Sequence, residues 1–157
     1  MQYHTPVQRT QFGDMACSIA RTLDVAGEPW TPLIIRDLWV GLTRFDDLQR
    51  SLGISRKVLT ERLKWLVARG VVEPQPYSEH PLRYDYVLTE KGRELCDILL
   101  AITAWGDRWT AGDGGPPVLI RHDGCGKVTH VEPHCAVCGA PMHAADVTIE
   151  PGPGYRP

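Results

Sequence analysis

Apolar residues recur at helical spacing along the first two thirds of the chain. A first helix is predicted over residues 17–26, because its apolar positions three or four residues apart fall on one face. These positions are Ile19, Leu23 and Ala26. A second helix is predicted to begin at Pro32 with Thr31 as its N-cap, since proline fits the first helical position. Its apolar residues predict a central core helix, and they are Leu33, Ile34, Ile35, Leu38 and Trp39.

Two short amphipathic helices follow, separated by a tight turn at Gly53. The inner face of the first is marked by Phe45, Leu48 and Leu52. In the second helix, Ser55 is the predicted N-cap and Gly70 the predicted end. Its inner face carries Val58, Leu59, Leu63, Leu66 and Val67. A helix, a turn and a second helix of this kind predict a helix-turn-helix unit.

The period of the pattern changes after Gly70. Residues 71–73 and 84–88 read as strands, and the prolines between them predict a loop. A hairpin directly after the second helix of a helix-turn-helix is the arrangement called a wing. Thr89 then caps a long helix, predicted to run to about Trp105. Its apolar stripe consists of Leu95, Leu99 and Ile102, with Ile98 and Trp105 close by. The stripe predicts pairing with a second copy of the chain, and the alternative is packing on the chain's own core.

The predicted fold is mainly α with a small β-hairpin wing, plus a small C-terminal β ribbon. The ribbon is predicted to pair residues 127–131 with a later strand around residues 147–149. The predicted organisation is a flexible arm over residues 1–15, a winged helix-turn-helix domain over 16–110, a linker over 111–117, a separate unit over 118–150 and a disordered tail over 151–157.

No apolar run approaches the roughly 20 residues that a membrane span needs, and the first residues lack the apolar centre of a signal peptide. The expected location is therefore the cytoplasm, without membrane association.

Charge is distributed unevenly along the chain. Residues 44–70 hold seven basic and three acidic side chains, whereas residues 106–157 hold four basic and six acidic ones. The net charge of −2 does not by itself indicate nucleic acid, but phosphate affinity depends on local positive potential. A short helix with a cationic, hydrogen-bonding outer face is what the major groove of DNA accepts. The predicted groove-facing residues are Ser55, Arg56, Lys57, Thr60 and Lys64.

Other cations have less specific predictions. Arg62 and Arg69 are predicted to be surface or phosphate-facing cations. Arg83, near the tip of the hairpin, is predicted to reach a minor groove or a phosphate. The alternative for Arg83 is a solvated cation at a strand end, and for the basic helix face as a whole it is an ordinary solvated surface.

Four segments of the chain resemble the HxlR-type winged helix-turn-helix transcriptional regulators. They are residues 17–38, Arg44-Phe-Asp-Asp-Leu48, residues 53–63, and the run 84–92, which ends in Leu-Thr-Glu-Lys-Gly. The resemblance covers residues 17 to about 109. It implies a homodimeric bacterial transcription factor on a palindromic operator, with the five helix residues above in or over the major groove. It leaves open the operator, the signal and a small-molecule effector.

Cys17 occupies the position at which some redox-sensing members of this family keep a reactive cysteine. The resemblance therefore implies oxidation of a thiolate there, followed by a disulfide across the dimer or with a small thiol. The alternative is that Cys17 packs as a small apolar residue.

Two matching short motifs occur in the last quarter of the chain. Each places two metal-binding residue types three positions apart and follows them with a glycine. Two such turns facing each other give the tetrahedral geometry of structural zinc, with ligands predicted to be His122, Cys125, Cys135 and Cys138. His130, His134 and His143 compete as the fourth ligand, and a ribbon without metal is the alternative.

The sequence also bears on two other classes of function. A catalytic zinc would need a general base, and Glu132 and Asp123 are near the cysteines in sequence only. No phosphate-binding loop or nucleophile elbow occurs, so the chain is not expected to be an enzyme. A winged-helix module that binds protein rather than DNA remains the second alternative.

Overall fold

The computed structural model describes residues 12–155. The first eleven residues of the predicted arm and the last two of the predicted tail lie outside the described residues. The elements are α1 (Ser18–Ala26), α2 (Thr31–Trp39), α3 (Phe45–Leu52), α4 (Arg56–Ala68), β1 (Val72–Glu79), β2 (Leu82–Leu88), α5 (Glu90–Thr110), β3 (Arg121–His122), β4 (Lys127–Val128) and a 3-10 turn over Ala144–Asp146.

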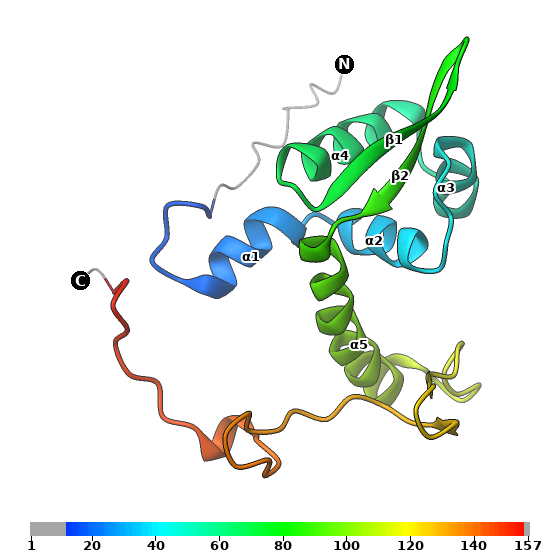
Figure 1. The fold of residues 1–157 in the computed structure, drawn as a ribbon. Coiled ribbons are helices and arrows are strands. Elements are labelled where there is room, and N and C mark those ends of the chain that lie inside the picture. Colours follow the sequence, from blue (N-terminus) through cyan, green and yellow to red (C-terminus); the bar gives the residue numbers. More distant parts are fainter. Residues whose placement is uncertain (1–11, 156–157) are drawn as a thin grey trace, which may run out of the picture.

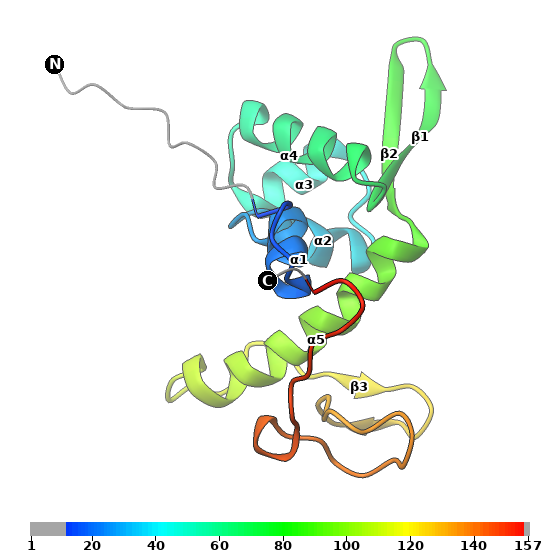
Figure 2. The same ribbon diagram turned by 90° about the vertical axis from the view of Figure 1, so that its left-hand side faces the viewer.

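The arrangement of these elements is a winged helix-turn-helix, as predicted. Figure 1 shows α2, α3 and α4 gathered at one end of the molecule, with the β1–β2 hairpin projecting beside them. The long helix α5 leaves this body, and the C-terminal segment with β3 and β4 lies beside its distal half (Figure 2). None of the helices in residues 12–155 combines the length and apolarity that a bilayer crossing requires.

The core lies between α2, α3, α4 and the start of the wing. The predicted inner residues of the helix-turn-helix are there, because burying them removes apolar area from water at roughly 25 cal/mol per Å². The buried cluster consists of Ile34, Ile35, Leu38, Leu48, Ile54, Leu59, Leu63, Leu66, Val71, Val72 and Cys96. This core holds the two helices of the helix-turn-helix and the base of the wing in one rigid frame.

Gly92 lets α5 approach the wing closely. A side chain at Gly92 would collide with the carbonyl oxygen of Val71, so only glycine fits. The hydroxyl of Thr89 accepts a hydrogen bond from Gly92 N at 3.2 Å and donates to Gly70 O at 2.7 Å. The predicted cap is therefore confirmed, and the same threonine ties the end of α4 to the start of α5.

The wing is longer than predicted. Residues 74–79, expected as a loop because of their prolines, belong to β1, and only residues 80 and 81 connect the strands. Proline is compatible with a two-stranded sheet because both strands are edges and have one side without a hydrogen-bonding partner. The register shifts between Pro76 and Ser78.

Three other predictions differ from the structure. Helix α2 begins at Thr31 rather than after it, with Trp30 as N-cap, and α5 runs to Thr110 rather than Trp105. Strand β4 pairs with the preceding β3 and not with residues 147–149, since the four residues 123–126 are the shorter route to an antiparallel pair. The apolar face of α1 points outward, with Ile19 and Leu23 exposed.

Candidate nucleic-acid interface

The turn between α3 and α4 sets the direction of α4. Gly53 takes the left-handed conformation, with φ of 65°, and its N–H donates to Gln49 O at 2.9 Å. The buried Ile54 anchors the turn, and its carbonyl accepts from Gln49 Nε2 at 3.4 Å. The Ser55 hydroxyl then accepts from Val58 N at 3.3 Å, which confirms Ser55 as the N-cap of α4.

The predicted groove-facing residues share the solvent side of α4. Leu59, Leu63 and Leu66 occupy its buried side. The N-cap Ser55 and the cations Arg56, Lys57 and Lys64 are exposed, and Thr60 is half-buried among them. A helix of 13 residues is about 20 Å long, enough to lie along a major groove about 12 Å wide.

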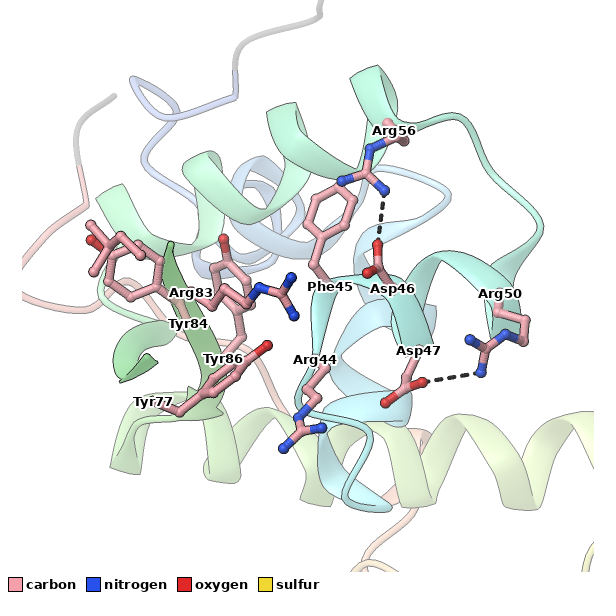
Figure 3. Close-up of a pocket in the computed structure, with 11 residues that line it drawn as sticks. Arg44, Phe45, Asp46, Asp47, Arg50, Arg56, Tyr77, Arg83, Tyr84 and Tyr86 are labelled. Carbon is pink, nitrogen blue, oxygen red and sulfur yellow. Dashed lines mark hydrogen bonds and ion pairs between the residues drawn. The ribbon is translucent and has the colours of Figure 1, made fainter. Parts of the chain in front are cut away.

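Arg56 is engaged by α3 in a way that the sequence did not indicate. Its Nη1 donates to Asp46 Oδ1 at 2.8 Å and to Gln49 Oε1 at 3.2 Å. The guanidinium carbon lies 4.6 Å from the centre of the Phe45 ring (Figure 3). A cation over an aromatic face is attracted by the negative charge of that face. The first residue of α4 is thus held against the start of α3.

A cleft of about 530 Å³ separates α3 from the wing. Its lining combines four arginines, three tyrosines and two aspartates: Arg44, Phe45, Asp46, Asp47, Arg50, Arg56, Tyr77, Leu82, Arg83, Tyr84 and Tyr86. Arg83 is exposed near the start of β2, close to the turn of the hairpin as predicted. Cations and tyrosine hydroxyls are the groups that contact DNA phosphates.

Asp85 fixes the base of the wing to the α2–α3 loop. Its Oδ1 accepts from the Thr43 hydroxyl at 2.9 Å and lies 3.7 Å from Arg44 Nε. Tyr86 N donates to Thr43 O at 2.8 Å. Arg44 also lies over the ring of Tyr77, 4.8 Å from its centre. These contacts hold the wing and the helix-turn-helix at one relative position.

Arg62 and Arg69, predicted to be surface or phosphate-facing cations, both pair with carboxylates, and Arg69 is exposed whereas Arg62 is half-buried. Arg62 pairs with Glu28 at 3.2 Å, and Arg69 pairs with the buried Asp24 at 3.0 Å. Trp65 Nε1, between them, donates to Val25 O at 3.3 Å. This side of α4 therefore binds α1 and the loop after it, and the two arginines have structural contacts.

Cys17 is the N-cap of α1 and is half-buried. All five cysteines lie in the described part of the chain and are free thiols. Cys96 is buried, and burial raises the pKa of its thiol, which the carboxylate of Asp97 raises further. Cys96 is therefore an unreactive core thiol, whereas Cys17 is accessible at a helix N-terminus.

The two C-terminal motifs form matching turns. Gly126 N donates to His122 O, and Gly139 N donates to Cys135 O, both at 2.8 Å. Both glycines have positive φ, at 67° and 72°. N–H groups of Cys138 and Val137 lower the pKa of the Cys135 thiol. Each turn thus has the predicted local form.

The predicted zinc ligands are not brought together. Within residues 12–155, no three histidine, cysteine or carboxylate groups gather in an arrangement suited to a metal ion. The competing histidines have local contacts: His130 with Glu132 at 3.1 Å, and His134 with the carbonyl of Glu132 at 3.0 Å. The zinc site stays a prediction.

The chain is similar to a known protein family and to several regulators. The family model of the HxlR-like helix-turn-helix matches residues 25–113. An uncharacterized HTH-type transcriptional regulator of Mycobacterium tuberculosis is 43% identical over 141 residues, which are 88% of this chain and 88% of that protein.

Two solved structures are also similar. The crystal structure of PA1607 has a TM-score of 0.80 at 34% identity, covering 90% of this chain and 99% of that one. The redox regulator HypR in its reduced form has a TM-score of 0.55 at 33% identity, covering 59% of this chain and 92% of that one. The family model and the similar regulators agree with the helix-turn-helix and wing described above. The chain belongs to the HxlR-like helix-turn-helix family of transcriptional regulators.

Proposed function

We propose that this chain binds a palindromic operator as a homodimer and regulates transcription from it. The observation that carries the proposal is the outer face of α4, where Arg56, Lys57 and Lys64 are exposed beside the wing. In this proposal Ser55, Arg56, Lys57, Thr60 and Lys64 read or flank the major groove. Arg83 contacts a phosphate or the minor groove from the wing. No catalytic step is part of it.

A second copy of the chain would cover the exposed apolar stripe of α5. Ile98, Ile102, Trp105 and Trp109 follow one another at spacings of four, three and four residues and are 48%, 56%, 63% and 65% exposed. Such spacing is that of helices that pair along a seam. The outward apolar residues of α1, Ile19 and Leu23, add to the exposed area. An apolar surface of this extent marks an interaction site, and two-fold pairing matches a palindromic operator.

Salt-dependent binding to duplex DNA tests the proposal. The probe is the DNA upstream of the chain's own coding sequence, titrated by fluorescence anisotropy at several salt concentrations. We expect Arg56→Ala and Lys64→Ala to weaken binding by roughly tenfold, since a base or phosphate contact is worth about 1–3 kcal/mol. Removing a phosphate contact also lowers the salt slope by about one.

Lys127→Ala is the matched control, because Lys127 is an exposed cation on β4, away from α4. It should bind like the wild type. Absent or salt-insensitive binding by the wild type would favour the alternative of a module that binds protein. Equal affinity of Arg56→Ala, Lys64→Ala and the wild type would show that α4 does not enter the groove.

Redox sensing through Cys17 is a second candidate function. The half-buried thiol at the N-cap of α1 and the likeness to the redox regulator HypR favour it. Diamide would accept two electrons and two protons as two Cys17 thiols join in a disulfide. We expect a covalent dimer on a non-reducing gel and an altered DNA affinity, both absent in Cys17→Ser and reversed by dithiothreitol. No covalent dimer in the wild type would exclude a disulfide across the dimer.

We also propose structural zinc at His122, Cys125, Cys135 and Cys138. The two matching turns support it, although no three donors gather around a metal position within the described residues. Zinc would supply a cross-link to a unit with few buried side chains. Metal analysis of protein purified without chelator tests this: one zinc per chain supports it, and none refutes it.

A further inference from the structure

The two carboxylates at the start of α3 lie where DNA phosphate would be attracted in their absence. Asp46 and Asp47 are in the first turn of α3, and a bare helix N-terminus is a ready site for anions. Each carboxylate pairs with an arginine of the cleft: Asp46 with Arg56 at 2.8 Å and Asp47 with Arg50 at 3.1 Å (Figure 3). The two carboxylates at the start of α3 are therefore each engaged with a cation of the cleft.

The two pairs differ in what they restrain. Arg50 is on α3 itself, three residues from Asp47, so this pair stays within one helix. Arg56 is the first residue of α4, and Asp46 reaches it across the turn. Gln49 and the ring of Phe45 hold the same guanidinium from two further sides. Of the two ion pairs, the one with Asp46 therefore constrains the first residue of α4, whereas the one with Asp47 does not involve α4.

We propose that Asp46 is a specificity-determining residue, which withholds Arg56 from the phosphates of non-cognate DNA. This inference rests on the proposed DNA-binding function. A phosphate and the Asp46 carboxylate both offer Arg56 negatively charged acceptor oxygens. Moving Arg56 from Asp46 to a phosphate therefore gains little binding free energy. A guanine edge offers two acceptors in a bidentate arrangement and discriminates between bases by roughly tenfold or more. Arg56 leaves Asp46 when the correct base is present.

The experiment compares Asp46→Asn with Asp47→Asn, a matched control that removes one neighbouring carboxylate of the same helix turn. Arg56→Ala and the double variant Asp46→Asn with Arg56→Ala complete a double-mutant cycle. The probes are a duplex selected by the wild-type protein from a random pool and a scrambled duplex of the same length and composition. Affinities are measured by anisotropy from low to physiological salt.

Asp46→Asn should tighten binding to the scrambled duplex by up to about fivefold, the upper end of the range for an exposed ion pair. The salt slope on that duplex should steepen by about one, because Arg56 gains a phosphate. Affinity for the selected duplex should change less, so the ratio of the two affinities falls. Asp47→Asn should tighten binding to the scrambled duplex less than Asp46→Asn does. In the Arg56→Ala background, Asp46→Asn should tighten binding to this duplex by no more than Asp47→Asn does in the wild type.

Two results would overturn the proposal. Equal effects of Asp46→Asn and Asp47→Asn on the scrambled duplex would mean that only local charge matters. Loss of affinity for the selected duplex alone would mean that Asp46 supports Arg56 in the complex instead of restraining it. If the wild-type protein selects no duplex and binds none in a salt-dependent way, the DNA-binding function itself fails. Both asparagines replace exposed carboxylates of equal size, and urea unfolding midpoints verify that the variants fold.

Discussion

At the scale of single residues, long-range polar partners decide what each arginine of α4 does. Asp24 is 7% exposed and accepts from Arg69 at 3.0 Å and from Phe12 N at 3.4 Å. Arg69 also stacks on Trp65, 4.1 Å from the ring centre. The partners Asp24 and Arg69 are 45 residues apart in the chain. Periodicity and local charge could not reveal this pair, because nothing within one helix depends on it.

Asp24→Ala is expected to lower the free energy of unfolding by about 1–3 kcal/mol. The change removes a mostly buried acceptor from both the Arg69 guanidinium and the Phe12 N–H. Urea unfolding at one fixed protein concentration measures the change. Asp47→Ala is the control, since its ion pair of 3.1 Å is exposed and should contribute less than about 1 kcal/mol. Equal destabilisation by the two variants would contradict the larger contribution of Asp24 to stability.

At the scale of elements, α5 divides its apolar residues between two surfaces. Leu95 and Leu99 pack against the core, together with the buried Cys96. They are therefore not the free stripe that the sequence predicted for pairing. The residues left exposed lie about a quarter turn away and are Ile98, Ile102, Trp105 and Trp109. The sequence showed that α5 was apolar on a wide arc, but only packing showed which part of the arc the core uses.

Ile102→Asp is expected to convert the proposed dimer to a monomer. A charge in the middle of the exposed stripe would have to lose its hydration in a paired state, which costs several kcal/mol. Light scattering coupled to size exclusion measures the mass at micromolar concentration. Ala101→Asp introduces the same charge at the adjacent exposed position off the stripe and should leave the mass unchanged. A dimer that survives Ile102→Asp would place the interface elsewhere.

At the scale of the whole molecule, the end of α4, the wing and α5 meet at one junction. Val71 lies three residues after the end of α4, and its carbonyl accepts from Thr89 N at 3.1 Å. Gly92 then packs against the same carbonyl. A change in the direction of α5 would therefore displace the end of α4 and the base of the wing. A dimer built on α5 would set the distance between two copies of α4.

The C-terminal unit is the part of the molecule that the core does not organise. Nearly all its residues are exposed, and a cleft of about 1000 Å³ separates it from Trp105 and Trp109 of α5. The two turns at His122 and Cys135 form from local hydrogen bonds, so their sequence pattern predicted them correctly. Their relative placement depends on groups outside the turns, which the pattern did not specify.

The sequence by itself determined the features that arise within one helix or turn. Ser55 and Thr89 cap helices with their own hydroxyls, Gly53 turns the chain, and apolar spacing defines the inner face of α4. The tertiary structure alone decided which groups meet across the fold. Asp46 restrains Arg56, Asp24 binds Arg69, and both pairs join separate elements. The physical reason is range: a cap or a turn is complete within a few residues, whereas an ion pair between elements exists only after the core has brought them together.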